Sequence, residues 1–516
     1  MSALPPNWRD AFRGYQLEDA EWLTSLPPNT RARCLTNGLG TGKTSSALAS
    51  TLLAFERDLI EQPLVVGFTT ASSVHDWRRE AEKRWPGLRF VMPGVKKSVT
   101  KRKSESAEEF ERRKQDAHDN AEWRQLIRDA ASGKLDRPAL LIGDYYWTEQ
   151  ILDLVIDLGI LLDKALFDEA HLLKKASSGR ARSVRSVIAR TRNTTMLTGT
   201  PVHNRAHDLH NLLTLCAPSA FPANAFTWAR NYFHIKLKDG NYPYIADLKD
   251  KPRLIEDIKP FVAGRTAAEL MGDDLPARTF QLKLVDVPGT VRMSPAKMRA
   301  KKSEEVDALL RETVRHKFEA ALEVARDADK PLVLYTYRRE DATKLAAFLN
   351  KNGVPSLLAT GDLTNTARDK VIERWKLGEG MALVCTMDAV RESATLTRAD
   401  LMVFVDLHWL PTVLLQCQGR IDPARQPADQ RRPVLYVYLV TKGGPDEVVA
   451  EVVVEKLREA SGVGVKTEGG DRLADFLAPL DSRKEVQKAL DPQEVMASLV
   501  DRLNARANRL ADLGML

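Results

Sequence analysis

A glycine-rich loop near the start of the chain carries the strongest chemical signal in the sequence. The segment LTNGLGTGKTSSAL lies between an apolar stretch and a helix-forming one, and it holds Gly40, Gly42, Lys43 and Thr44. Glycines let backbone N–H groups close around phosphate oxygens, and the positive end of the following helix adds to the attraction. Lys43 can reach the β- and γ-phosphates, and the Thr44 hydroxyl can ligate Mg²⁺. The loop predicts phosphate binding, although Asn37 stands where the strict pattern has its first glycine.

A pair of neighbouring carboxylates forms the second signal. Asp168 and Glu169 end an apolar stretch in KALFDEAHLLKK. We expect Asp168 to hold Mg²⁺ on a bound phosphate and Glu169 to orient or deprotonate the attacking water. Acidic pairs are common on protein surfaces, but this pair ends a buried-strand pattern downstream of a phosphate loop. His171 lacks the HExxH spacing of zinc proteases, so it is not expected to ligate zinc.

These motifs need a scaffold that delivers loops to one edge of a sheet. Short apolar segments alternate with helix-forming ones, which is typical of an open, mostly parallel α/β sheet. A second series of this kind begins near residue 331, so we expect two similar lobes with a cleft between them. The expected strands are 33–36, 64–69, 139–143, 164–167 and 194–197 in the first series, and 332–335, 355–359, 381–385, 401–405 and 434–440 in the second.

The domain divisions follow from where this alternation stops. A polar stretch that opens with the basic run KKSVTKRK predicts an inserted arm. This arm is interpreted either as an auxiliary DNA contact or as a solvated loop. An aromatic and proline-bearing stretch predicts a helical insertion, and a terminal amphipathic stretch predicts a packing helix or a partner-binding element. The expected divisions are lobe one at 1–285, with the charged arm at 96–137 and the helical insertion at 205–275, lobe two at 286–464, and a helical tail at 465–516.

Composition excludes several classes of protein. The 516 residues are too many for one ordinary core, and 43% hydrophobic with 28% charged residues is typical of globular chains rather than disordered or fibrous ones. No apolar run approaches the ~20 residues of a membrane-spanning helix, and no signal peptide is evident, so we expect a cytoplasmic protein without a membrane partner. The four cysteines show no CxxC pairing, which disfavours a zinc knuckle. The excess of 77 basic over 70 acidic residues is too small to identify a polyanionic partner.

With these motifs placed, the chain resembles superfamily-two helicases, and within them the Swi/Snf-type branch of double-stranded-DNA translocases. FRGYQLEDAEWL is similar to the branch's adenine-reading segment, which implies that Gln16 contacts the base. NGLGTGKT resembles motif I, which itself lacks the first glycine, and the resemblance continues through motifs Ia, II and III in PLVVGFTTASSVHDWRREAEKRWP, DEAHLLKK and LTGTPVHNRAHDL. KPLVLYTYRREDATKLAAFL resembles motif IV, and the segment from VCTMDAV to GRIDPARQ spans motifs V and VI. ESATLTRADLMVF and WLPTVLLQ resemble stand-alone, annealing-helicase-like members, including phage-borne ones.

The resemblance implies two tandem RecA-like lobes that bind ATP and Mg²⁺ between them. It also implies a role for individual residues. The implied catalytic residues are Lys43, Asp168, Glu169, Arg420 and Arg425; the nucleotide contacts are Gln16, Gly40, Thr41, Gly42, Lys43 and Thr44, with Thr44 and Asp168 on the metal; the nucleic-acid contacts are Ser72, Thr200, Arg338, Arg368 and Thr386; and the coupling residues are His171, Thr198 and Gln416. Arg338 has a second interpretation, as the solvated start of a helix.

Two departures from the family pattern bear on activity. Motif VI of the family reads roughly QxxxRxxRxGQ, and its two arginines face the γ-phosphate. Gln416 and Arg420 match, but Pro423 takes the place of the second arginine and Arg425 lies two residues further on. Either Arg425 takes over the role, or Arg420 suffices, or hydrolysis is weak. In motif V, Ser393 replaces a usual glycine.

The resemblance therefore implies a monomeric ATP hydrolase that moves on, or remodels, duplex or forked DNA through backbone contacts. Replication, recombination or repair is the expected setting, and replication or repair proteins are candidate partners. One alternative is a nucleic-acid-binding module whose ATPase activity is weak or lost, motivated by Pro423 and Ser393. The other is the motor subunit of a restriction or defence complex, which would need a partner because no nuclease motif is evident in the chain.

Overall fold

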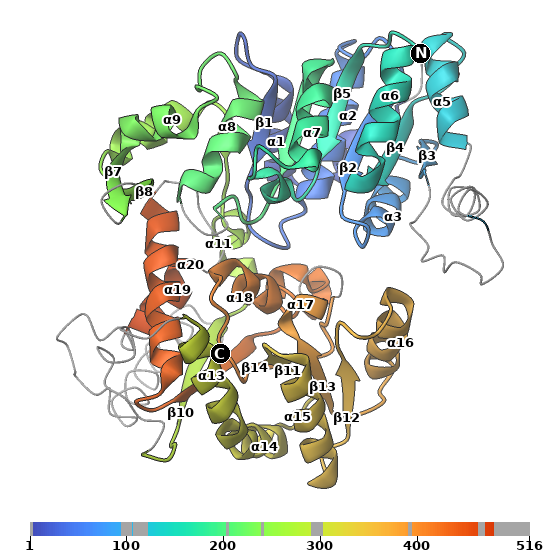
Figure 1. Cartoon of the computed structure of the whole chain (residues 1–516). Coiled ribbons are helices and arrows are strands. Elements are labelled where there is room, and N and C mark those ends of the chain that lie inside the picture. Colours follow the sequence, from blue (N-terminus) through green and yellow to red (C-terminus); the bar gives the residue numbers. More distant parts are fainter. Residues whose placement is uncertain are drawn as a thin grey trace, which may run out of the picture.

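The chain folds into two α/β lobes. The computed structural model describes residues 4–93, 106, 122–202, 206–238, 242–289, 303–390, 395–462 and 470–478. In Figure 1, lobe one is the upper body, coloured blue to green, and lobe two is the lower body, coloured olive to red. Each lobe is a parallel sheet with helices on both faces, as the alternating pattern predicts. The predicted fold class is confirmed.

Lobe one is built on a seven-stranded sheet. Its strands are β1 (Ala32–Leu35), β2 (Leu64–Thr69), β3 (Arg89–Val91), β4 (Ala139–Asp144), β5 (Leu162–Phe167), β6 (Thr191–Leu197) and β9 (Val262–Ala263). Their order is β3-β4-β2-β5-β6-β1-β9, and neighbouring strands run parallel. β1 and β5 are buried along their whole length, as expected for strands covered on both faces, although β1 contains Arg33 and β5 contains Asp163 and Lys164. The carboxyl ends of these two strands carry the phosphate loop and the carboxylate pair.

Helices cover both faces of this sheet. One face packs against α1 (Gly14–Thr24), α2 (Lys43–Glu56) and α3 (Val74–Arg84). The other packs against α5 (Glu122–Ala131), α6 (Thr148–Asp157), α7 (Gly179–Ala189) and α8 (Leu209–Cys216). α5 buries Trp123, Leu126 and Ile127 in the core, so the end of the predicted charged arm is a packed helix. The basic run at its start lies outside the described residues.

Lobe two is built on a six-stranded sheet. Its strands are β10 (Arg278–Val285), β11 (Leu332–Thr336), β12 (Ser356–Ala359), β13 (Ala382–Thr386), β14 (Leu401–Phe404) and β15 (Val434–Thr441), in the parallel order β10-β15-β14-β11-β13-β12. The surrounding helices are α13 (Ser303–Thr313), α14 (Lys317–Asp327), α15 (Arg339–Lys351), α16 (Asn365–Lys376), α17 (Met387–Val390), α18 (Pro411–Gln418), α19 (Pro445–Gly462) and α20 (Gly470–Leu477).

The predicted boundary between the lobes at residue 285 is wrong. β10 pairs with β15 along its whole length, so lobe two's sheet begins at residue 278. The strand was missed because RTFQLKLV alternates polar and apolar residues at a half-exposed sheet edge and shows no apolar run. In Figure 1, β10 lies in the lower lobe, and its neighbour in the sheet is β15.

The predicted helical insertion at 205–275 also needs correction. It contains α9 (Ala225–Tyr232), α10 (Lys251–Ile258) and α11 (Ala267–Met271), but also an antiparallel hairpin of β7 (Phe233–Lys238) and β8 (Tyr242–Leu248). Its chain then returns to lobe one's sheet through β9, which pairs with β1. Of the predicted tail, α20 packs on α19, and residues 479–516 lie outside the described residues, as does Ser393. Among the described residues, no helix has the length and apolarity needed to span a membrane.

Candidate active site

The phosphate loop connects the end of β1 to the start of α2. Gly40 and Gly42 adopt φ angles of 79° and 77°, a left-handed conformation that side chains other than glycine rarely allow. The Nζ of Lys43 donates hydrogen bonds to the carbonyl oxygens of Asn37, at 2.9 Å, and Gly38, at 3.1 Å. The lysine thus lies folded over the loop, at the amino end of a 14-residue helix. This is the geometry of a phosphate cradle that the glycine spacing predicts.

Asn37, which replaces the usual first glycine, has a structural task. Its side chain is buried, donates to Asp19 Oδ2 at 2.7 Å and accepts from the backbone N–H of Arg265 at 2.9 Å. Asp19 in turn accepts from the Arg265 guanidinium at 2.7 Å and from Ser46 at 2.9 Å. The amide therefore ties α1, α2 and the segment after β9 to the phosphate loop. A glycine at this position would leave the buried carboxylate of Asp19 with one donor fewer.

A pocket of about 290 Å³ opens between α1, the phosphate loop and α3. Gln16, the predicted base contact, lines it, and the Nε2 of Gln16 lies 3.4 Å from the carbonyl oxygen of Thr41 and 3.5 Å from that of Gly42. A Cβ on Gly42 would lie 2.6 Å from this amide nitrogen, so a side chain there would displace Gln16, and the φ of 77° would strain it as well. The pocket is lined by Arg13, Gln16, Gly40, Thr41, Gly42, Thr44, Ser45, Asp76, Glu80 and Arg84.

Asp168 is held at the end of β5 by donors from three directions. Its Oδ2 accepts from Thr69 Oγ1 at 3.0 Å and from Trp77 Nε1 at 2.9 Å, while its Oδ1 accepts from the N–H of Glu169 at 2.9 Å. Burial, and then the neighbouring Glu169, raise the pKa of Asp168. A buried carboxylate with spare lone pairs gains most from a cation, and together with the Thr44 hydroxyl it supplies the oxygen ligands that Mg²⁺ prefers. The donor set therefore fits the predicted metal.

Glu169 occupies a strained backbone position beside His171. Its φ is 51°, in the left-handed region. The Nδ1 of His171 lies 3.1 Å from Glu169 Oε2 and 3.2 Å from Thr198 Oγ1. Burial opposes ionisation of Glu169, but His171, Lys43 and then Arg420 outweigh it and lower the pKa of this carboxyl to about 2. Glu169 is therefore anionic at neutral pH and suited to orienting a water molecule.

The segment after β6 lies against both the phosphate loop and the carboxylate pair. The N–H of Thr198 donates to the carbonyl oxygen of Leu35 at 3.1 Å, and Thr198 Oγ1 accepts from the N–H of Thr200 at 3.1 Å. A Cβ on Gly199 would lie 3.2 Å from Lys43 Nζ, so this segment lies against the lysine of the phosphate loop. Thr200 is buried, with 1% of its surface exposed, and does not face an outer surface in this conformation. The geometry links Thr198 and His171, two of the three predicted coupling residues.

Two arginines of lobe two complete the site. Arg420 lies just beyond α18, is buried, and donates from Nε to the carbonyl oxygen of Gln416 at 3.1 Å. Arg425 reaches the phosphate loop, because a Cβ on Gly40 would lie 2.9 Å from its Cγ. The structure thus brings together every predicted catalytic residue, from both lobes.

The predicted nucleic-acid contacts follow strand ends but differ in exposure. Ser72 is exposed in the loop between β2 and α3, and its hydroxyl lies 3.0 Å from Thr70 Oγ1. Arg368 is half-buried in the first turn of α16, and Thr386 is buried at the end of β13. Their contact with nucleic acid stays a prediction.

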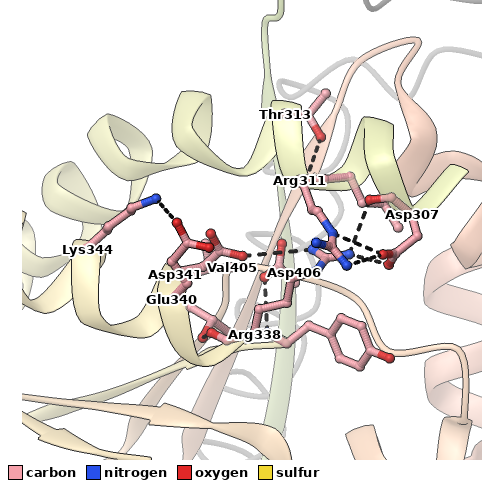
Figure 2. A network of polar contacts seen from close by, with 12 residues as sticks. Asp307, Arg311, Thr313, Arg338, Glu340, Asp341, Lys344, Val405 and Asp406 are labelled. Carbon is pink, nitrogen blue, oxygen red and sulfur yellow. Dashed lines mark hydrogen bonds and ion pairs between the residues drawn. The ribbon is translucent and has the colours of Figure 1, made fainter. Parts of the chain in front are cut away.

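Arg338, another predicted phosphate contact, is enclosed by carboxylates of its own lobe. Its guanidinium pairs with Asp307 of α13 and lies 3.8 Å from Asp341 of α15 (Figure 2). Only 16% of its side chain is exposed, so it is not the solvated helix start that was the alternative interpretation. Asp307 also accepts from Arg311 at 3.1 Å. A phosphate that reached Arg338 would have to compete with Asp307.

Sequence reasoning missed several residues that hold the site together. Trp77 and Thr69 fix Asp168, and Tyr145 donates to the backbone carbonyl of Asp168 at 2.6 Å. Trp77 is a family position in motif Ia, but the motif alone does not reveal its partner. The Asp19–Asn37–Arg265 network was also missed, because its members lie far apart in the sequence.

Comparisons with known proteins identify the family of the chain. A family model described as the SNF2-related domain matches residues 15–321, and one described as the helicase conserved C-terminal domain matches residues 316–422. The chain is 24% identical over 452 residues to "SWI/SNF-related matrix-associated actin-dependent regulator of chromatin subfamily A-like protein 1" of Xenopus tropicalis, covering 84% of this chain and 43% of that protein. It is 22% identical over 543 residues to "Chromodomain-helicase-DNA-binding protein 1-like" of Danio rerio, covering 95% of this chain and 47% of that protein. It thus spans less than half the length of these two relatives.

A solved structure described as "Sulfolobus solfataricus SWI2/SNF2 ATPase core in complex with dsDNA" aligns over 92% of this chain and 96% of that one. The TM-score is 0.38 and the sequence identity is 16%.

Proposed function

The chain belongs to the SNF2-related helicase family, and from that premise we propose that it hydrolyses ATP between its two lobes and uses the cycle to move on, or remodel, duplex or forked DNA. The observation that carries the proposal is the convergence of charged groups from both lobes on one phosphate loop. Lys43, Asp168 and Glu169 come from lobe one, and Arg420 and Arg425 come from lobe two. A site shared between two bodies can couple a chemical step to their relative movement.

The residues divide the chemistry of phosphoryl transfer among them. Lys43 exchanges its carbonyl partners for the phosphates, and the backbone N–H groups of the loop hold the phosphate oxygens. Thr44 and Asp168 would hold Mg²⁺, which offsets phosphate charge when it is bound. Glu169, anionic and fixed by His171, orients the attacking water.

The route from this site to DNA is proposed to run through the segment after β6. His171 joins Glu169 to Thr198, and Thr198 caps the backbone of Thr200. Asp168 is joined through Trp77 to α3, whose preceding loop carries the exposed Ser72. The carboxylates are therefore connected to the surface loop through a short series of packed residues, which can transmit a change in the charge bound at the site. Contacts from such loops go mainly to the DNA backbone, which fits movement without sequence reading.

The finer proposal is action on replication, recombination or repair intermediates inside the cytoplasm of a bacterium or phage-infected cell. Its support is the resemblance to stand-alone, annealing-helicase-like members. The alternative of a binding module without hydrolysis was motivated mainly by Pro423. It is less well supported, because Arg425 reaches the phosphate loop despite Pro423. A motor subunit of a defence complex would be detected by co-purification of a nuclease.

The test is the ATPase rate measured against single-stranded, duplex and forked DNA and against RNA. We expect duplex or forked DNA to stimulate turnover most. Lys43→Ala should lower turnover by roughly 10²-fold or more, because it removes a donor to the phosphates. Lys344→Ala, which removes an exposed lysine on α15, is the matched control and should behave as wild type. Turnover unchanged by every nucleic acid would contradict the proposal.

A further inference from the structure

The β7–β8 hairpin forms a two-stranded sheet of its own within the insertion of lobe one. In Figure 1 it lies at the outer end of that insertion, beyond α9. Its root is held by the lobe: Phe233 is buried against Trp228, with ring centroids 5.5 Å apart. Ile235, Ile245 and Leu248 pack on the core of lobe one. The hairpin is therefore an anchored ribbon that presents its outer part in a fixed direction.

The register of the two strands separates an inner face from an outer one. Ile235 pairs with Ile245, and the next pair toward the tip is Lys236 with Tyr244. Directly opposite residues share a face, and successive residues of a strand point to opposite faces. Because Ile235 and Ile245 pack on the core, Tyr244, Lys236 and Tyr242 lie on the outer face. A bulge between Phe233 and Ile235 keeps the apolar residues of the root on the inner face.

The two tyrosines of the outer face are open to solvent. Tyr242 is 72% exposed and Tyr244 is 44% exposed. Residues two apart on a strand lie ~7 Å from each other, so the rings can serve two successive ligand groups. An aromatic ring stacks on the flat face of a nucleobase of any type, but in a duplex these faces are covered by neighbouring bases. The pair therefore suits unpaired bases.

Basic residues accompany the tyrosines. Residues 225–260 contain seven lysines and arginines and five aspartates and glutamates. Lys249, which follows β8, is exposed, and its Nζ donates to the carbonyl oxygen of Arg230 at 2.7 Å, a neutral acceptor. Lys236 pairs with Asp247 at 2.6 Å, but both side chains are exposed, so this ion pair is weak and can yield to a phosphate. Lysine is depleted in protein–protein interfaces, whereas lysines between aromatic rings are typical of surfaces that bind single strands.

From this juxtaposition we infer that the outer face of the hairpin binds the single-stranded arm of forked DNA. Tyr242 and Tyr244 stack on unpaired bases, and Lys236 and Lys249 lie near the phosphates between them. The inference rests on the proposed function and narrows its substrate from duplex or forked DNA to forked DNA. Loops at the strand ends hold the duplex backbone, and the hairpin adds a second contact that exists only where the strands have separated.

The experiment compares the full chain carrying Tyr242→Ala and Tyr244→Ala with a matched control carrying Tyr242→Phe and Tyr244→Phe. Fluorescence anisotropy measures the affinities for labelled blunt duplex, forked duplex, single-stranded DNA and single-stranded RNA of the same sequence. The alanine pair should lower the affinities for forked and single-stranded DNA about tenfold or more, because two stacked bases are lost. Its affinity for blunt duplex should stay within about twofold of the wild type. The phenylalanine pair keeps both rings and should bind every probe within about threefold of the wild type.

A second readout reports stacking itself. The fluorescence of 2-aminopurine placed in the unpaired arm should be quenched by the wild type and by the phenylalanine pair, but not by the alanine pair. Circular dichroism and ATP affinity show whether each variant is folded, since the hairpin lies outside the nucleotide pocket.

The outcomes separate this inference from the proposed function. If no nucleic acid stimulates ATP turnover by the wild type, the proposed function fails, and the ratio of fork affinity to blunt-duplex affinity still tests the hairpin. If the alanine pair keeps the wild-type ratio, the inference is overturned, and the exposed tyrosines serve another partner such as a protein. Tighter tyrosine-dependent binding of RNA than of DNA would overturn the assignment to forked DNA.

Discussion

Asp168 and Glu169 are neighbours in the chain, yet their surroundings move their pKa values in opposite directions. Burial and the adjacent carboxylate raise the pKa of Asp168. For Glu169, the effect of burial is outweighed by His171, Lys43 and Arg420, and the pKa falls to about 2. Groups with separated pKa values take separate tasks in a site. Asp168 is suited to a cation and Glu169 to an oriented water.

A third titrating residue, outside the site, predicts how stability depends on pH. Lys164 on β5 is fully buried, and burial lowers its pKa to about 7 although its Nζ donates to Asn193 at 2.9 Å. In the unfolded chain this lysine titrates near its ordinary value of 10.5. Between these values the unfolded state binds more protons, so stability rises with pH.

We therefore expect the free energy of unfolding of the wild type to rise between pH 7 and pH 10 more steeply than that of Lys164→Met. The difference in rise should be up to about 3 kcal/mol, from the roughly 1.4 kcal/mol of each pKa unit. Urea unfolding of both proteins at several pH values measures it. Lys344→Met, which changes an exposed lysine, should follow the wild-type curve. Parallel curves for wild type and Lys164→Met would contradict the prediction.

Helix α13 lies against the turn between β11 and α15. Its Asp307 neutralises the charge of Arg338 in that turn. The pairing of Arg338 with Asp307 (Figure 2) competes with any phosphate that approaches from solvent. Position in motif IV predicts a phosphate contact for this arginine. The ion pair with Asp307 and the predicted phosphate contact are compatible if Arg338 exchanges Asp307 for a phosphate when DNA binds.

This exchange predicts opposite effects of two substitutions on DNA affinity. Asp307→Asn removes the competing charge and should tighten duplex binding several-fold, whereas Arg338→Ala should weaken it. Arg338→Ala should also reduce the salt slope of binding by about one unit, because one phosphate contact is lost. Fluorescence anisotropy at several salt concentrations measures both effects. Asp247→Asn, at an exposed ion pair of the β7–β8 hairpin, is the control. Unchanged affinity in both site variants would remove Arg338 from the DNA contacts.

At the scale of the whole molecule, the two lobes meet at the phosphate loop. Leu39 of this loop is buried between glycines of both lobes. A Cβ on Gly199 in lobe one would lie 2.9 Å from one methyl group of Leu39, and a Cβ on Gly419 in lobe two would lie 3.0 Å from the other. The phosphate loop thus carries one of the apolar contacts between the lobes.

This contact predicts that Gly419→Ala hinders closure of the lobes. We expect it to lower DNA-stimulated turnover several-fold without changing ADP affinity. Leu39→Ala removes the methyl groups that the new side chain meets, so the double variant should recover part of the loss. A coupling on the order of 0.5–3 kcal/mol is expected for groups in contact. Gly179→Ala, where nothing lies within 4 Å, is the control. Strictly additive losses would contradict the proposed contact.

Local patterns along the chain are enough to predict the two-lobe fold, the phosphate loop and the carboxylate pair. Buried parallel strands are short apolar runs, and the glycines of a phosphate cradle are neighbours in the chain, so both leave local patterns. β2 begins and ends where the pattern predicts, at Leu64–Thr69. Motif order also predicts that Arg420 and Arg425 belong to the site, but it leaves their roles open.

Which distant residues meet follows from packing and has no signal in the sequence. β10 joins lobe two because an edge strand needs a partner on one side, and its alternating sequence does not say which sheet supplies one. Asn37 is a tie to Asp19, Arg338 is enclosed by Asp307, and Arg425 lies against Gly40, yet none of these contacts has a local signal. Each is set by how helices and lobes pack over long sequence separations. Local pattern therefore identifies the chemical groups, and packing decides which of them act together.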